Sequence, residues 1–156
     1  TDGRNNSWVN ATIANQLALY VTMSSPLQMA ADLPEHYAKF MDAFQFIKDV
    51  DIDWLQSKYL LAEPGEYVVV ARQGKKKGQW FCGGVTDDNA RTLEVPMNFL
   101  EAGKTYEATI YADAADADYK ENPQAYVIEK KNVTSEDVLS MTMARGGGFA
   151  ISFIEK

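Results

Sequence analysis

The chain has 156 residues, of which 46% are hydrophobic and 24% charged, and its net charge is −7. These values are typical of a folded globular protein and exclude a wholly disordered chain. The length suffices for one ordinary domain, or for one small domain with a piece of another. The acidic balance argues against a nucleic-acid partner, because phosphate binding needs clustered Lys and Arg. The one basic run, Lys75 to Lys77, lies between two glycines and predicts a solvated hairpin tip.

The segment from Ser7 to Ala31 contains no charged residue. Its amide and hydroxyl side chains make it too polar to cross a membrane, so we expect no membrane partner. Ile13, Leu17 and Val21 recur at every fourth position and predict a helix over residues 11–24 that is apolar nearly all round. We expect this helix to be buried against a sandwich, a second helix or another copy of the chain, since left exposed it would form a large apolar patch.

A strand and a second helix are predicted next. Pro26 ends the first helix, and the apolar run Leu27 to Ala31 is a candidate buried strand. Tyr37, Phe40, Met41, Phe44 and Ile47 form the apolar stripe of a helix over residues 34–50. This order resembles the closing segment of a (β/α)₈ barrel. We therefore assign residues 1–55 to the last helix–strand–helix segment of such a barrel.

The residue pattern changes from helical to strand-like after a short acidic linker at residues 49–54. Runs rich in Val, Tyr, Thr, Phe and Ile, separated by turn residues, predict strands at 66–72, 79–86, 91–95, 106–112, 125–130, 138–143 and 149–154. Such a series is typical of an antiparallel β-sandwich. The predicted fold class is therefore mainly β, with a C-terminal antiparallel β-sandwich over residues 56–156 preceded by the helical segment.

Several motifs resemble glycoside hydrolase family 97. They are Gln16–Val21, Ser25–Pro34, Asp42–Val50 with Asp53 and Trp54, Asp87–Thr92, Ala108–Asp113, Asn122–Tyr126, Val133–Ser135 and Gly146–Phe153. They follow the order of that family's C-terminal part, over nearly the whole chain. The resemblance implies the end of the catalytic barrel plus the C-terminal sandwich of an α-glycosidase of the α-glucosidase or α-galactosidase type, acting in carbohydrate catabolism.

The resemblance also implies partners and a location. We expect the rest of a longer parent chain, an oligosaccharide substrate of that parent, a homo-oligomer, and the periplasm of a bacterium such as a gut Bacteroides. The family's catalytic carboxylates and calcium-binding glutamates lie on earlier barrel strands, and no position here matches them. We therefore expect no catalytic and no metal-binding residue in this fragment, with calcium implied only for the full-length enzyme. The alternatives are a stand-alone carbohydrate-binding module and a structural oligomerisation domain.

Several aspartates are candidates for chemistry. Asp32 follows the predicted barrel strand, where barrel enzymes keep their sites, although it can equally begin a loop or cap a helix. Asp49, Asp51 and Asp53 imitate a calcium loop, but Trp54 and Leu60 stand where that loop needs Gly and Glu. A third acidic group, Asp113, Asp116 and Asp118, is better explained as a solvated loop than as an ion site.

The remaining candidates have structural explanations. Cys82 and His36 are the only residues of their types, so a zinc site is excluded, and we expect Cys82 to be a small strand residue. Gly146 to Gly148 precedes a predicted strand and favours a tight turn over a phosphate loop. The aromatic residues Trp80, Tyr106, Tyr111, Tyr119 and Tyr126 could form a sugar-stacking platform, although aromatic residues that alternate in strands are usually core.

Overall fold

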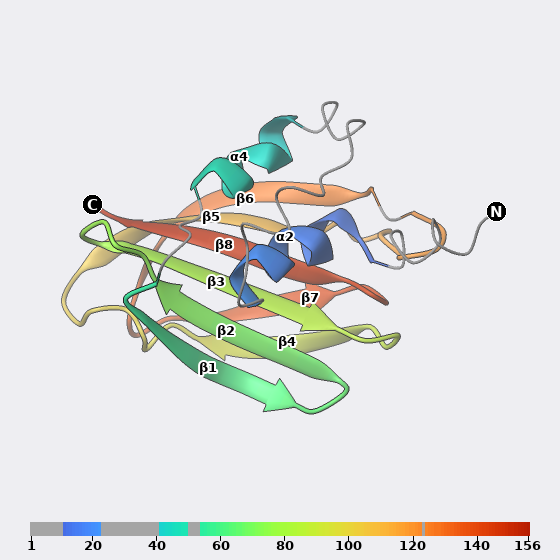
Figure 1. Cartoon of the computed structure of the whole chain (residues 1–156), viewed down its shortest axis with the longest axis horizontal. Helices are drawn as coiled ribbons and strands as arrows, with labels where there is room; N and C mark the ends of the chain where they lie inside the picture. The colour runs from blue at the N-terminus through green and yellow to red at the C-terminus, as the bar shows by residue number, and fades with distance from the viewer. Residues whose placement is uncertain (1–10, 23–40, 50–53, 123) are drawn as a thin grey trace.

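The computed structural model describes residues 11–22, 41–49, 54–122 and 124–156 (Figure 1). Within these ranges two helices, α2 (Ile13–Thr22) and α4 (Met41–Asp49), precede a series of strands. The strands are β1 (Gln56–Glu63), β2 (Tyr67–Gln73), β3 (Gln79–Thr86), β4 (Arg91–Pro96), β5 (Thr105–Asp113), β6 (Tyr126–Thr134), β7 (Val138–Met143) and β8 (Gly148–Glu155). None of the described helices is long and apolar enough to span a bilayer.

The strands form the predicted antiparallel β-sandwich. One sheet has six strands in the order β1-β2-β3-β8-β5-β6, and the other pairs β4 with β7. Every pairing of neighbouring strands is antiparallel. Each of the seven predicted strands is present as one of β2 to β8. The exposed run Lys75 to Lys77 forms the turn between β2 and β3, as predicted.

Strand β1 has no counterpart among the strands predicted from the sequence. It is an edge strand, and most of its side chains are exposed, so its sequence lacks the alternation that marks a half-buried strand. Its pairing with β2 also shifts register between Tyr59 and Leu61. By contrast, β7 alternates strictly between exposed and buried side chains, and its bounds were predicted without error.

Two hydrophobic cores lie on the two faces of the six-stranded sheet. The first fills the sandwich and includes Trp80, Phe99, Tyr106, Met143 and Phe153. The second lies between the sheet and the helices, and its buried members are Ile13, Leu17, Tyr20, Val21, Ala43, Phe46, Phe81, Tyr111 and Ala150. Figure 1 shows α2 crossing the face of β3 and β8, with α4 beside it. The molecule therefore has a helix layer, a large sheet and a small sheet.

Over its described residues, helix α2 confirms the expectation that the helix predicted at residues 11–24 is buried. It packs on the sandwich and on α4, and Ala14, Ala18 and Val21 are fully buried. Gly83 on β3 permits this approach, because a Cβ at that position would lie 2.8 Å from the carbonyl oxygen of Ala18. The predicted strand at 27–31, most of the linker at 49–54 and the first half of the second helix lie outside the described residues. The barrel origin of residues 1–55 therefore stays a prediction.

Candidate functional site

The N-terminal end of α2 is held by the loop between β7 and β8. The backbone N–H of Thr12 donates to the carbonyl of Gly146 at 3.1 Å. The Asn15 side-chain amide donates to the carbonyl of Gly147 at 2.8 Å. The Thr12 hydroxyl caps the helix by accepting a bond from the Asn15 N–H at 3.1 Å. Since Thr12 and Asn15 are both buried, these bonds fix the helix start against the sandwich.

Glycines allow this loop to approach its neighbours closely. Gly146 adopts a positive φ of 62°, which favours glycine. A Cβ on Gly147 would lie 1.9 Å from the Oδ2 atom of Asp113. The prediction of a tight turn before the last strand is therefore confirmed. Gly146 to Gly148 do not form a phosphate loop, because β8 begins at Gly148 where a phosphate loop requires a helix.

Asp113, the last residue of β5, also holds the loop between β7 and β8. Its Oδ2 atom accepts hydrogen bonds from the N–H groups of Ala144 at 2.9 Å and Gly148 at 3.0 Å. Burial raises the pKa of this carboxyl above its ordinary value, although hydrogen bonds from Thr12, Ala144 and Gly148 act in the opposite direction. Asp113 thus contacts both the helix cap and the glycine loop.

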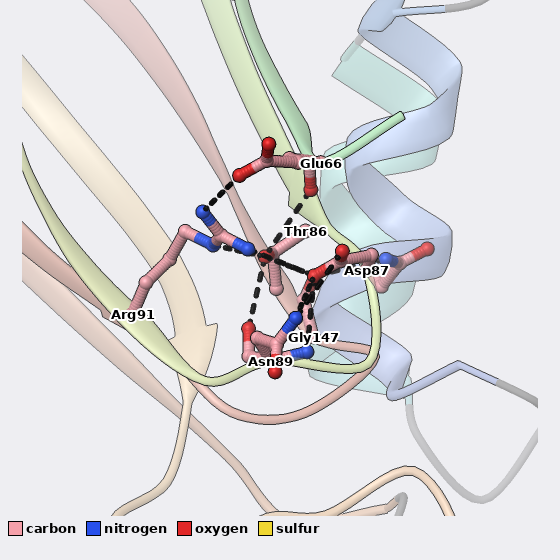
Figure 2. A network of polar contacts seen from close by, with 7 residues as sticks. Glu66, Thr86, Asp87, Asn89, Arg91 and Gly147 are labelled. Carbon is pink, nitrogen blue, oxygen red and sulfur yellow. Dashed lines mark hydrogen bonds and ion pairs between the residues drawn. The ribbon is translucent and has the colours of Figure 1, made fainter. Parts of the chain in front are cut away.

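A polar network centred on Arg91 holds the loop between β3 and β4 (Figure 2). The Arg91 guanidinium donates to Thr86 Oγ1 at 2.7 Å and pairs with Asp87 at 2.9 Å and Glu66 at 3.5 Å. It also lies 4.9 Å from the centre of the Tyr67 ring. The carbonyl of Asp87 accepts a bond from Gly146 N–H at 2.7 Å, which joins this network to the glycine loop.

The electrostatics of this network do not suit acid–base catalysis. The N–H of Asn89 and the guanidinium of Arg91 lower the pKa of Asp87. The α-glycosidase activity that the sequence resemblance implies would need one carboxyl whose raised pKa keeps it protonated as the general acid. Arg91 instead pairs with the side chains of Glu66 and Asp87. The network therefore stabilises the loop arrangement.

The C-terminal end of α2 is held by Arg72 of β2. Its guanidinium donates to the carbonyls of Val21 and, at 3.4 Å, of Thr22, which are among the helix's last unpaired acceptors. It also donates to Ser57 Oγ at 2.8 Å and lies 5.7 Å from the Trp54 ring. Burial lowers the pKa of Arg72. A cation at a helix C-terminus is favourable, so both ends of α2 are anchored to the sandwich.

Helix α4 is anchored mainly by one aromatic residue. The fully buried Phe46 packs edge-on against Phe81 at 5.9 Å and Tyr111 at 5.4 Å between ring centres. The Tyr126 hydroxyl donates to the carboxylate of Asp42 in the first turn of α4. Burial, and then Asp42, raise the pKa of Tyr126 to about 12. Sequence reasoning missed these anchors because they join residues far apart in the chain.

The acidic candidates Asp113, Asp116 and Asp118, which lie in the described part of the chain, do not form a metal site there. Asp118 binds Arg145 at 2.6 Å, and Asp116 accepts a bond from the Asn122 amide at 3.1 Å. Among the described residues no group of three or more His, Cys, Asp or Glu side chains could hold a metal ion. The calcium that the resemblance implies for the full-length enzyme does not fit the described part of this chain. Asp32, His36, Asp51 and Asp53 lie outside the described residues.

The aromatic candidates do not form one sugar-stacking platform. Trp80 and Tyr106 are buried in the sandwich core, whereas Tyr111 is buried on the opposite face of the same sheet beneath the helices. Tyr119 stacks with Arg145 at 5.4 Å. Strand alternation sends Trp80 and Tyr106 to one face of the sheet and Tyr111 to the other, so the expectation that aromatic residues alternating in strands are core is confirmed for these three. Cys82 is a buried strand residue, as expected.

Comparisons with known proteins identify the family to which this sequence is similar. The family described as "Glycosyl-hydrolase 97 C-terminal, oligomerisation" matches residues 53–154. A "Retaining alpha-galactosidase" of Bacteroides thetaiotaomicron is 36% identical over 140 residues, which are 90% of this chain and 20% of that protein. A "Probable retaining alpha-galactosidase" of Streptomyces bingchenggensis is 33% identical over the same shares.

A solved structure extends the match. A glycoside hydrolase family 97 enzyme from Pseudoalteromonas, in complex with acarbose, is 43% identical with a TM-score of 0.86, covering 94% of this chain and 23% of that one. The chain thus spans about a fifth of the length of the curated relatives it matches. The motifs quoted from the sequence and the sandwich agree with these matches. The chain belongs to the C-terminal domain family of glycoside hydrolase family 97.

Proposed function

We propose that this chain is the C-terminal part of a longer α-glycosidase, of the α-galactosidase or α-glucosidase type. In this proposal it supports the catalytic barrel and mediates self-association, and it does not hydrolyse glycosides alone. Support comes from the description of the family as an oligomerisation domain, from the α-galactosidase names of two relatives, and from the share of their length that this chain spans. The substrate would be an oligosaccharide with an α-linked terminal sugar.

One observation carries the supporting role. Helix α2 precedes the sandwich in the chain, yet it is anchored at its start by Asn15 and at its end by Arg72, and it covers a buried core. Because α2 is fixed to the sheet at both ends, the chain that leads into α2 would enter at a fixed place on the sheet. We propose that the upstream barrel is held on this helical side of the six-stranded sheet.

The metal and the location follow as further parts of the proposal. We propose that the calcium of the full-length enzyme is held by residues outside the described part of this chain, which offers no three-ligand group. We also propose a periplasmic parent, as the family resemblance implies. Fractionation of cells that produce the native parent, with enzyme assays of each fraction, would test the location.

The catalytic part of the proposal is tested by assaying the purified chain on nitrophenyl α-galactoside and α-glucoside. We expect no turnover above buffer, because Arg91 pairs with Glu66 and Asp87 and because the resemblance implies that the family's reacting acids lie on earlier barrel strands. A commercial α-galactosidase serves as the positive control. Turnover that persists through repurification would contradict the proposal.

The carbohydrate-binding alternative is tested by affinity electrophoresis in starch and galactan gels. We expect migration equal to that in a gel without polysaccharide. Trp80→Ala should lower stability by about 3–5 kcal/mol, because Trp80 is a core residue, without changing migration of the folded protein. Retardation by either polysaccharide would favour a binding module.

A further inference from the structure

Strand β6 is an edge that no described strand covers on its outer side. All six residues from Val127 to Asn132 are exposed, including the apolar side chains of Val127 (50%) and Ile128 (37%). An exposed edge presents unpaired backbone N–H and C=O groups that can bind a strand of another chain. The outer edge of β6 is therefore able to pair with a strand of another chain.

The two edges of the sheet differ in their suitability for pairing. Strand β6 pairs with β5 from Thr105 to Asp113 without any shift of register. Strand β1, at the other edge, carries an irregularity between Tyr59 and Leu61. Irregularities of this kind bend and twist a strand, and natural sheets use them to block edge pairing. The β6 edge is thus the one with regular geometry.

We infer that β6 pairs antiparallel with β6 of a second copy, around a two-fold axis that passes through Lys130. This inference rests on the proposed self-association and names its surface. Lys130 is the middle residue of the nine-residue strand Tyr126–Thr134, so this register pairs the strand over its whole length. A two-fold contact must be complementary to itself, which makes the order of side chains along β6 the test of the idea.

The charges of β6 are complementary to themselves in this register. Glu129 of each copy lies opposite Lys131 of the other, on the same face of the sheet, and symmetry makes two such pairs. Opposite charges directly across a strand pair stabilise it, and like charges destabilise it. Moving the axis to Glu129 or to Lys131 would place that residue opposite itself and abolish both attractive pairs. The central register therefore combines full overlap with attraction.

The apolar residues agree with the same register. Val127 lies opposite Val133 of the other copy, which is buried in its own sandwich core, so at each end of the interface the half-exposed Val127 would lie beside the edge of that core. With the axis at Glu129, Val127 would instead face the ammonium of Lys131. The one unfavourable contact is Lys130 opposite Lys130, on the other face of the sheet. Its long side chains can diverge into solvent, because Lys130 is exposed.

Cysteine cross-linking tests the register. Directly opposite residues in an antiparallel pair have Cα atoms about 4.5–5.5 Å apart, within the range of a disulfide. Lys130→Cys should therefore form a covalent dimer under mild oxidation. Ile128→Cys is the matched control, because its two copies would lie about 13 Å apart, four residues along the strand. The native Cys82 is buried and should not contribute.

Charge reversal tests the energetics by sedimentation velocity on the 156-residue chain. Glu129→Lys and Lys131→Glu should each weaken the dimer about tenfold or more, because each turns two attractive pairs into repulsive ones. An equimolar mixture of the two variants should restore dimers, since every pair is then attractive. Glu63→Lys on β1 and Lys77→Glu in the β2–β3 turn are controls at exposed sites, and they should leave association unchanged.

The outcomes separate the surface from the proposed function. A wild-type chain that stays monomeric at every concentration overturns both. A dimer that survives Glu129→Lys, or that is broken equally by Glu63→Lys, overturns the β6 surface and leaves self-association standing. Cross-linking of Ile128→Cys as fast as Lys130→Cys overturns the register. Circular dichroism spectra of all variants, matched to the wild type, show that each variant is folded.

Discussion

The side-chain amide of Asn15 donates a 2.8 Å hydrogen bond to the carbonyl of Gly147, across 132 residues of sequence. Asn15 is buried, so its amide has little access to water as a replacement partner. We expect Asn15→Ala to lower the free energy of unfolding by about 1–2 kcal/mol, as for loss of a buried hydrogen bond. Urea unfolding followed by circular dichroism would measure this.

Gln45→Ala is the control for Asn15→Ala. Gln45 also donates an amide hydrogen bond of 2.8 Å, to Asp49, but this bond is exposed and lies within α4. Water can replace it, so the loss should be within about 0.5 kcal/mol. Equal losses for the two variants would show that the contact with Gly147 has no special weight.

Gly83 determines how closely α2 approaches the sheet. An added Cβ would lie 2.8 Å from the carbonyl oxygen of Ala18 and 2.9 Å from the Cβ of Val21, both on α2. Gly83→Ala should therefore push the helix away and destabilise the protein by about 1–3 kcal/mol. Hydrogen exchange should rise mainly in the amides of α2.

A neighbouring glycine supplies the comparison for Gly83→Ala. A Cβ on Gly84 would meet the ring of Phe149, on the sandwich side of β3. Gly84→Ala should thus raise exchange in β8 and spare α2. If Gly83→Ala left the exchange of α2 unchanged, the direct packing of that helix on β3 would be refuted.

Local patterns predicted most of the fold. The alternation in β7 and the four-residue spacing of Ile13, Leu17 and Val21 each fixed an element, because burial on one face imposes a period. Most side chains of the edge strand β1 are exposed, so its sequence shows no alternation of apolar and polar residues. A sequence pattern reports a strand's environment, and an exposed edge has nearly the environment of a loop.

The contacts between elements could not be predicted in the same way. Arg72 bonds the end of α2 from β2, and Asn15 bonds the β7–β8 loop, but nothing in the local sequence of either residue indicates its partner. The aromatic residues show the same limit. The sequence predicts that Trp80 and Tyr111 both lie in strands. Only the pairing of β3 and β5 with β8 determines that they pack in different cores.

Asp113 should make stability depend on pH with an unusual sign. Its pKa is raised above the ordinary value of 3.8, mainly by burial, so the native state holds the proton more tightly than the unfolded state. Its contribution is therefore fully present below pH 3.8 and is lost as pH rises through the folded-state pKa. The wild type should lose stability relative to Asp113→Asn over this rise, measured by urea midpoints. A difference that moves the other way would contradict the assignment.

Asp118 should show the opposite dependence. Arg145 and the N–H groups of Glu121 and Lys120 lower the pKa of this carboxyl well below 3.8. Its contribution is present above pH 3.8 and is lost as pH falls through the folded-state pKa. Asp118→Asn should thus be less stable than the wild type at neutral pH, and the difference should shrink in acid. A difference that is constant with pH would show that the Asp118–Arg145 pair does not contribute as an ion pair.

Cys82 should be chemically inert until the sandwich opens. Its side chain is fully buried in the core beside Trp80 and Ile151, and burial raises the pKa of the thiol far above its ordinary value. The reactive thiolate is therefore scarce as well as inaccessible. We expect negligible labelling by a maleimide at about pH 8 in the native state, and complete labelling in urea. A labelling rate near that of a free thiol would contradict burial of Cys82, and with it the packing of β3 in the sandwich core.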